Sequence, residues 1–340
     1  MPGFFAATTS VLMGATGNNA VPLAVLVGSG VASLSLLVAV NVWFVSELAI
    51  LLWAVILKIA LFKLNGFETN HDNKGSMMKM VQVNDTLVNL KVQGAGEPVL
   101  FLHGVPDTSD VWQQAMNALS GQYLCLAPDL PGFGETKAAR NFNYSLENLA
   151  KFVDDLLLTQ GISTGVNLVI HDVGGIVGLA WALKYSEKVK SITIMDTVFF
   201  SDYKWHAMAK TWRKPIVGEL TMLLMRFKQF NAAMKAGAPS LSTAQIKANY
   251  KHLSFRNRLM ILRLYRALDP SVFKGWEENL SRLTKKVPTQ VIWGNKDTFL
   301  PVSLASRFAT SKVHIIEPSG HWPMLEHPEK VHELIIEHIG

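Results

Sequence analysis

The chain has 340 residues, of which 49% are hydrophobic and 17% are charged, and its mean hydropathy is +0.21. This composition is too apolar for a disordered protein, and the length suffices for one large or two small domains. Cys125 is the only cysteine, which excludes an intramolecular disulfide and a thiolate metal cluster. The formal net charge of +6 shows no basic run, so we expect weak attraction to anionic lipid and no nucleic-acid partner.

The apolar excess lies at the N-terminus, where residues 1–46 carry no charged side chain. Within them, the 26 residues from Val21 to Ser46 exceed the ~20 that a helix needs to cross a bilayer. A shorter apolar segment, Leu48 to Phe62, follows. We therefore expect residues 1–64 to form a membrane anchor. This anchor is either a single transmembrane helix or a helical hairpin; in a further arrangement, the second segment lies in the membrane–water interface.

A polar linker is expected at residues 65–76, after the anchor. A cleaved signal peptide is the alternative interpretation, but the first residues lack Lys and Arg and the apolar region is too long for one. If the chain crosses the membrane once, the positive-inside bias places its remainder in the cytoplasm. The basic residues that set this bias are Lys58, Lys63, Lys74 and Lys79.

From Met77 onward, short β-rich apolar runs alternate with segments of helix length. This alternation predicts an α/β fold with a mostly parallel sheet covered on both faces. Reactive groups in such sheets lie on loops at the carboxyl ends of strands. The expected strands are Met78–Val83, Leu87–Gln93, Pro98–Leu102, Tyr123–Ala127, Val166–Ile170, Ser191–Met195, Thr289–Trp293 and Val313–Ile316, and the clearest helices are Ser145–Gln160, Gly175–Tyr185 and Glu329–Ile339.

Asp172 stands at one of these strand ends, in the segment LVIHDVGGIVG. The small residues after it allow the sharp strand-to-helix turn that exposes one side chain at the top of a sheet. Lipases place Ser at this position, whereas a carboxylate is already ionised at neutral pH and can attack an alkyl carbon to form an ester. The alternative is that Asp172 only caps the helix that follows it.

A second strand end carries His103-Gly104-Val105-Pro106, which resembles the HGxP turn that supplies a main-chain amide to an oxyanion hole. The backbone amides of Val105 and Val173 are therefore the candidate oxyanion donors. The segment DLPGFG, Asp129 to Gly134, follows another expected strand and is interpreted as a turn.

Asp297 and His321 follow the last two expected strands, in the segments VIWGNKD and PSGHW. Asp172, Asp297 and His321 thus occur along the chain in the order nucleophile, acid and base that is described for strand-end triads of this kind. Each residue alone is a weak signal, but three such groups at three strand ends favour a nucleophilic role for Asp172.

From about Met77 to Gly340 the chain resembles the α/β-hydrolase fold, in the branch that contains haloalkane dehalogenases and epoxide hydrolases. The resemblance rests on HGVPDTSDVW, APDLPGFGET, LVIHDVGG, GLAWALKYSEKVKSITIMD, WGNKD and SGHW. It implies an eight-stranded, mostly parallel sheet built from residues 77–197 and 284–340. A helical cap, residues 198–283, is inserted between these parts, and its segment 217–236 reads as one long helix.

The family resemblance also implies a two-step hydrolysis without a cofactor or a metal. Asp172 attacks a saturated carbon, and His321 then activates a water that hydrolyses the resulting ester. The acid that orients His321 is Asp297 or, in an alternative position of the family, Asp196. Val105 and Val173 stand where dehalogenases have halide-binding side chains, and neither side chain donates a hydrogen bond.

The leaving group would therefore depend on residues of the cap. Epoxide hydrolases use cap tyrosines to protonate the departing alkoxide, and an atypical dehalogenase would use cap indoles. The candidates for the substrate pocket are His103, Tyr203, Trp205, Trp212, Tyr250 and Tyr265, with Phe199, Phe200, His206, Phe227 and Phe230 as further apolar lining.

We expect a membrane-anchored hydrolase that opens epoxides of small lipophilic substrates, taken from the lipid bilayer, with water. The first alternative is a haloalkane dehalogenase-like enzyme with an atypical halide site, and the second is a catalytically silent ligand-binding protein. A serine esterase is disfavoured because it requires Ser at position 172.

Overall fold

A computed structural model describes residue 75 and residues 77–340 of the chain. The predicted membrane anchor, 1–64, and the predicted linker, apart from Gly75, lie outside the described residues. Among the residues that are described, we find no helix with the length and apolar character needed to cross a bilayer. The described residues belong to one compact unit, 69–340.

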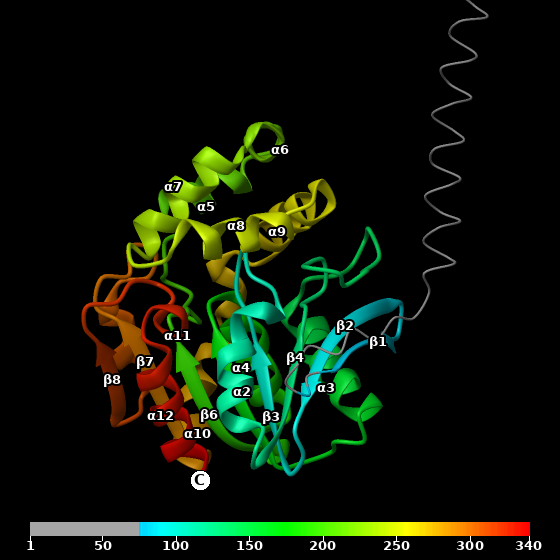
Figure 1. Ribbon diagram of the computed structural model, residues 1–340, viewed down its shortest axis with the longest axis vertical. Helices are drawn as coiled ribbons and strands as arrows, with labels where there is room; N and C mark the ends of the chain where they lie inside the picture. The colour runs from blue at the N-terminus through cyan, green and yellow to red at the C-terminus, as the bar shows by residue number, and fades with distance from the viewer. Residues whose placement is uncertain (1–74, 76) are drawn as a thin grey trace, which may run out of the picture. The chain divides into compact units, whose positions relative to one another are not determined.

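Eight strands form one sheet in the order β1-β2-β4-β3-β5-β6-β7-β8 (Figure 1). The pairs β1–β2 and β2–β4 are antiparallel, and all other neighbours are parallel. Every predicted strand is present, with ends within two residues of those expected. The strands are β1 (Met77–Val83), β2 (Thr86–Gln93), β3 (Glu97–Leu102), β4 (Tyr123–Pro128), β5 (Val166–His171), β6 (Val189–Met195), β7 (Thr289–Gly294) and β8 (Lys312–Ile316).

The central strands are buried on both faces. All residues of β5 and β7 are buried, although successive side chains of a strand point to opposite faces of the sheet. Helices therefore cover both faces, as expected for a parallel sheet. The helix α4 packs against α3 and α10, and α2 packs against α12. Their bounds are α2 (Gln113–Leu119), α3 (Leu146–Thr159), α4 (Val173–Lys184), α10 (Leu280–Lys286), α11 (Pro323–Glu326) and α12 (Pro328–Ile339).

Five further helices lie between β6 and β7, beyond the ends toward which the parallel strands point (Figure 1). The segment predicted as one helix over 217–236 is two helices, because the chain turns at Met225 and Arg226. There the Arg226 backbone amide donates to the side chain of Gln229, which starts a new helix. These cap helices are α5 (Ala207–Arg213), α6 (Val217–Leu224), α7 (Phe227–Gly237), α8 (Thr243–Lys251) and α9 (Phe255–Ala267).

Candidate active site

Asp172 lies at the sharp turn between β5 and α4. Its backbone φ is 49°, a left-handed conformation that is uncommon for a residue with a side chain. A Cβ on Gly174 would lie 2.3 Å from the carbonyl oxygen of Leu102, so this position of the turn requires glycine. Asp172 makes no side-chain hydrogen bond that caps α4. The helix-cap alternative therefore fails, and the carboxylate is left for other contacts.

The loop after β3 holds one oxygen of this carboxylate. The backbone amide of Val105 donates a hydrogen bond of 2.8 Å to Oδ1 of Asp172. Gly104 permits this approach, because a Cβ there would lie 2.4 Å from the Cβ of Asp172. Val173, the second predicted oxyanion donor, begins α4 directly after Asp172. Its role stays a prediction.

His321 faces the other oxygen of Asp172. The distance from His321 Nε2 to Asp172 Oδ2 is 3.5 Å, and His321 Nδ1 lies 2.7 Å from Oδ2 of Asp297. The second oxygen of Asp297 accepts hydrogen bonds from the amides of Phe299 and Leu300, which fix its orientation. The structure thus joins three strand ends in one chain of contacts, from Asp172 through His321 to Asp297.

Asp172 and His321 each favour the charged form of the other. Burial disfavours the ionised form of Asp172, but His321, His171 and the Val105 amide outweigh it and lower the pKa of the carboxyl to about 2. Burial likewise favours the neutral imidazole of His321. The carboxylates of Asp297 and Asp172 outweigh that effect and hold the pKa of His321 well above its usual value. This arrangement favours a protonated His321 between Asp172 and Asp297.

Asp196, the alternative acid, ends β6 next to this arrangement but is not the hydrogen-bond partner of His321. Its Oδ1 accepts a hydrogen bond from the amide of Gly294. Burial and the negative charge of Asp297 raise the pKa of Asp196 well above its ordinary value, which favours its neutral form. Single side-chain atoms of Asp196, Asp297 and His321 lie within 4.8 Å of one another, the spacing of a metal site. However, the His321 and Asp297 atoms already hydrogen bond to each other.

A cavity of about 450 Å³ lies over Asp172 and His321, between the sheet and the cap. Its lining is mainly apolar and comes from α5, α6, α7 and α9 as well as from the core. The lining residues are Val105, Pro106, Asp172, His206, Met208, Thr211, Trp212, Thr221, Met222, Leu224, Met225, Gln229, Phe230, Ala233, Met234, Leu253, Ile261, Tyr265, Phe299, His321 and Trp322.

Only some of the predicted pocket residues line this cavity. Among the predicted hydrogen-bond donors of the cap, Trp212 and Tyr265 do so. The hydroxyl of Tyr203 instead donates to the carbonyl oxygen of Phe299, and that of Tyr250 donates to Met225. The remaining predicted residues without a place in the lining are His103, Trp205, Phe199, Phe200 and Phe227.

His103 instead forms hydrogen bonds to two loops of the core. Its ring is fully buried, and Nε2 accepts a hydrogen bond from the backbone amide of Leu130 in the DLPGFG turn. Nδ1 therefore carries the proton and donates to the carbonyl oxygen of Gly104. His103 thus holds two loops together, and its position next to Gly104 in the sequence could not reveal that its ring is engaged by these loops and does not line the cavity.

His206 is a polar group of the cavity that sequence reasoning treated as apolar lining. Its Nδ1 accepts a hydrogen bond of 3.4 Å from the amide of Ala209 at the start of α5. Burial lowers the pKa of His206 to about 4, so the ring is neutral at neutral pH. A neutral imidazole that accepts at Nδ1 carries its proton on Nε2. His206 therefore adds a hydrogen-bond donor to the residues around Asp172.

The geometry agrees with the comparisons to known proteins. The family model described as the alpha/beta hydrolase fold matches residues 97–328. Lipase 1 of Psychrobacter immobilis is 27% identical over 242 residues, which cover 68% of this chain and 73% of the lipase. A cis-3-alkyl-4-alkyloxetan-2-one decarboxylase of Shewanella oneidensis is 27% identical over 270 residues, covering 73% of this chain and 82% of the decarboxylase.

Haloalkane dehalogenase 2 of Mycobacterium tuberculosis is 26% identical over 266 residues, which cover 73% of this chain and 90% of the dehalogenase. Among solved structures, an epoxide hydrolase of Vigna radiata superposes with a TM-score of 0.67 and 23% identity, covering 79% of this chain and 99% of the hydrolase. At that identity the superposition supports the fold and leaves the reaction to the residues of the site.

Proposed function

Because this chain belongs to the α/β-hydrolase family and is a hydrolase, we propose that it forms a covalent ester through Asp172 and opens epoxides of lipophilic substrates with water. One observation carries the proposal: Oδ1 of Asp172 is held by the Val105 amide, while Oδ2 faces His321 within the cavity. A carboxylate in this position can attack a saturated carbon. It has no hydroxyl proton to give to His321, which is the first step of a serine esterase.

In the first step, Oδ2 of Asp172 attacks an epoxide carbon and the C–O bond of the ring breaks. The low pKa of Asp172 keeps the nucleophile ionised at neutral pH without a separate base. The departing oxygen becomes an alkoxide and needs a proton or a hydrogen bond. Tyr265 lines the cavity and its hydroxyl can supply that proton, because burial raises the pKa of Tyr265 well above its usual value and keeps it protonated. Nε2–H of His206 is a second donor.

In the second step, water attacks the Cγ carbonyl of the ester, and Oδ1 becomes the oxyanion that the Val105 amide holds. Esterification removes the negative charge of Asp172, which is one of the two charges that raise the pKa of His321. The imidazolium can then pass its proton to the phenolate that Tyr265 became in the first step, and the neutral imidazole accepts one from the attacking water. Collapse of the tetrahedral intermediate breaks the bond between Cγ and Oδ2. The departing alkoxide takes the proton from His321 and leaves as the diol, and the carboxyl group left on Asp172 returns a proton to the ring. Asp297 orients the ring through Nδ1 and stabilises the imidazolium that forms.

The haloalkane dehalogenase alternative is favoured by one observation. Trp212 lines the cavity, and its indole Nε1 is buried with no hydrogen-bond partner among residue 75 and residues 77–340. A halide could accept from such a donor where Val105 and Val173 offer no side chain. A strained lactone of the oxetan-2-one class, named for the Shewanella relative, also presents a saturated carbon to Asp172 and belongs in the same substrate panel.

We further propose that the substrate is lipophilic, since the cavity lining is mostly apolar. An N-terminal anchor at residues 1–64, with the catalytic domain in the cytoplasm, stays a prediction from the sequence. So do the boundaries of the core and the cap.

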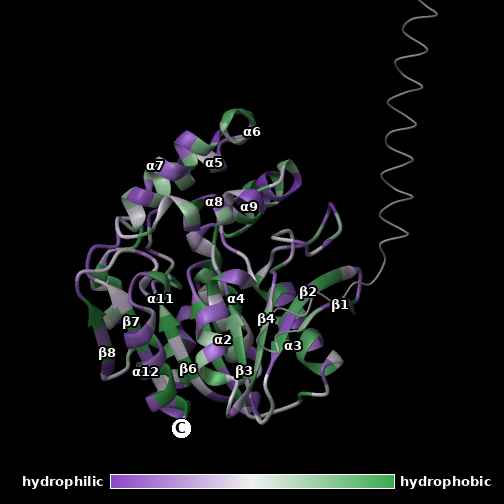
Figure 2. Ribbon diagram, in the orientation of Figure 1, coloured by the Kyte–Doolittle hydropathy of each residue, from purple (hydrophilic) through white to green (hydrophobic). Residues whose placement is uncertain are grey.

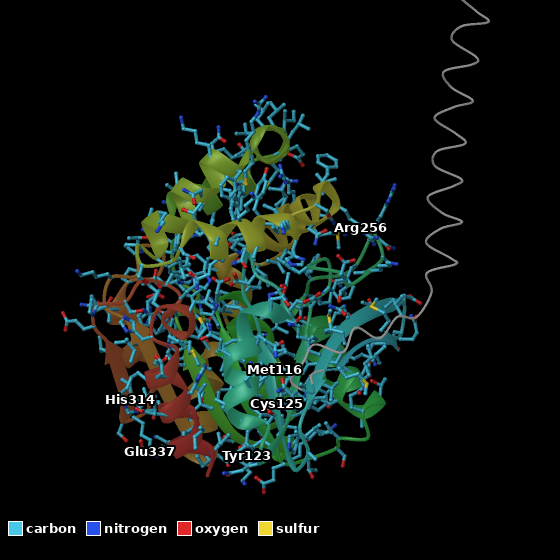
Figure 3. All side chains as sticks on the ribbon, in the orientation of Figure 1. Met116, Tyr123, Cys125, Arg256, His314 and Glu337 are labelled. Carbon is cyan, nitrogen blue, oxygen red and sulfur yellow. The ribbon has the colours of Figure 1, made fainter. Side chains whose placement is uncertain are left out.

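The experiment traps the ester in the full-length His321→Gln variant, which retains the nucleophile but lacks the base. We expect 1,2-epoxyoctane to raise the mass of the intact protein by the mass of the whole epoxide, located on Asp172 by peptide mapping. With 1-bromooctane the increase would be the octyl group less one hydrogen, so the two reactions are distinguishable. His314→Gln, which changes a histidine on the outer strand β8 (labelled in Figure 3), is the matched control and should turn over without an adduct.

An enzyme that turns over one of these compounds without any adduct in His321→Gln would refute the covalent scheme. Absence of both turnover and adduct across epoxides, haloalkanes and oxetanones would favour the silent ligand-binding protein. Asp172→Ala is expected to lose both the adduct and the turnover.

A further inference from the structure

The cap helix α6 carries an apolar stripe on its exposed side. Five side chains there are between 45% and 72% exposed, namely Ile216, Val217, Leu220, Leu223 and Leu224. The spacing of Val217, Leu220, Leu223 and Leu224 places these four on one face of the helix, and Ile216 is its N-cap residue. The opposite face is buried at Gly218 and Met222. A stripe of large apolar side chains in water is unusual enough on a folded protein to indicate an interaction surface.

This apolar stripe lies at the outer end of the cap. Within the described structure α6 packs against α5 and α9, and Figure 1 shows it farther from the sheet than the other cap helices. Figure 2 colours much of α6 as hydrophobic at this outer end of the molecule. The outer end of the cap therefore presents apolar side chains to its surroundings.

The stripe is continuous with the wall of the active-site cavity. Thr221, Met222, Leu224 and Met225 line the cavity, and Leu224 is at the same time 68% exposed. One helix thus presents apolar surface both to the outside and to the space above Asp172. Leu224 would therefore contact both an apolar molecule bound at the stripe and the interior of the cavity.

The cap is strongly basic, although the sequence shows no basic run. Residues 204–267 contain thirteen Lys or Arg and a single acidic residue, which gives them a formal charge of +12. The whole chain carries only +6, so its remaining residues are net negative by six charges. The one acid, Glu219, is neutralised by Arg266, whose Nη1 and Nη2 donate to both carboxylate oxygens. Exposed Lys214 and Arg226 stand immediately before and after the stripe.

We propose that α6 docks the cap onto the surface of an anionic lipid bilayer, with the apolar stripe at the boundary of head groups and acyl chains. Lys214 and Arg226 contact the anionic head groups at both ends of the stripe. Apolar side chains flanked by positive charge match lipid, whereas a second copy of the chain would bring two segments 204–267, each of charge +12, together. Only the further step, entry of a substrate from the bilayer, rests on the proposed function.

The test attaches an environment-sensitive fluorophore to a new cysteine in the full-length protein. Leu223→Cys places it on the stripe, where the side chain is 59% exposed. Ile315→Cys, at a 44% exposed position on β8, is the matched control. The native Cys125 is fully buried in β4, among the core elements where Figure 3 labels it, and does not compete for the label.

With vesicles that contain phosphatidylglycerol, we expect the label at position 223 to shift its emission to shorter wavelength and to be quenched by brominated acyl chains. The label at position 315 should do neither, and vesicles of phosphatidylcholine alone should give a weaker response at 223. Reversing the flanking charges with Lys214→Glu and Arg226→Glu should abolish most of the response. The same reversal at exposed Lys274 and Lys312 should preserve it.

Equal responses at the two labelled positions, or none at position 223 while the protein sediments with the vesicles, would overturn the proposal. A blue shift at 223 without vesicles, accompanied by energy transfer between differently labelled copies, would assign the stripe to a dimer instead. The fluorescence readout requires no turnover, so its failure leaves the proposed function untouched, and failure of the trapping experiment leaves the docking surface untouched.

Discussion

Asp107 offers a test of the electrostatics around the active site. Its carboxylate is 1% exposed and lies beneath the cavity, where it accepts hydrogen bonds from Nε1 of Trp322 and from Nδ2 of Asn249 in the cap. Burial raises the pKa of Asp107 to about 7, although the hydrogen bond from Trp322 opposes this rise. The group thus links the residue after His321, the loop after β3 and the cap helix α8.

A carboxyl with a higher pKa in the folded state binds its proton more tightly there than in the unfolded chain. Its contribution to stability is complete below the ordinary value of 3.8 and is lost as the pH rises through about 7. The difference between those two pKa values corresponds to about 4 kcal/mol of unfolding free energy, as an order of magnitude. At pH 8 the ionised Asp107 is therefore expected to cost the fold most of this amount.

Asp107→Asn removes the ionisation and retains an acceptor for the Trp322 indole, while the Asn249 amide can turn to match. The unfolding free energy of the variant, relative to wild type, is expected to increase by up to about 4 kcal/mol between pH 4 and pH 8. Urea unfolding of the full-length protein, followed by tryptophan fluorescence at each pH, measures this difference. Asp85→Asn, at an exposed turn, is the control and should show no such trend. A difference for Asp107→Asn that stays flat or decreases with pH would refute the reasoning.

Three further predictions concern turnover of the epoxide, measured as kcat. Asp297→Asn should lower kcat by about 10³- to 10⁴-fold, because His321 loses the partner that fixes its tautomer. Asp196→Asn should lower kcat by no more than about tenfold, since its neutral form is already favoured; a loss as large as that of Asp297→Asn would contradict this assignment. Tyr265→Phe should lower kcat by about 10²-fold on an epoxide but not on a bromoalkane, and equal losses on both would exclude its role as proton donor.

The fold could be predicted from the sequence because its central strands are short, buried and rich in residues that favour strands. Continuous apolar runs such as Tyr123–Ala127 admit few other interpretations once helix-length segments separate them. The break between α6 and α7 could not be predicted, since Met225 and Arg226 include neither the Gly nor the Pro that usually ends a helix.

The candidate catalytic residues could be located for a related reason. Parallel strands bring their carboxyl ends to one edge of the sheet, so Asp172, Asp297 and His321 had to lie near one another. The choice between Asp297 and Asp196 depended on a distance of 2.7 Å that no spacing in the sequence encodes.

The cavity lining was harder to predict because it depends on the direction of each side chain within the cap. Trp205 and Trp212 look equivalent in the sequence, but only Trp212 lines the cavity. Likewise, Tyr265 lines the cavity and Tyr203 does not. The hydrogen-bonding state of His206 follows from its contact with the Ala209 amide, which exists only in the folded helix α5.

The central claim is that an oxygen of Asp172 ends up in the product, and a single turnover in water enriched in a heavy oxygen isotope tests it most directly. With enzyme in excess over 1,2-epoxyoctane, we predict that the diol contains only ordinary oxygen and that the heavy isotope appears in the peptide containing Asp172. Heavy oxygen in the diol after that first turnover, with none in the peptide, would mean that water attacks the substrate itself and would contradict the account.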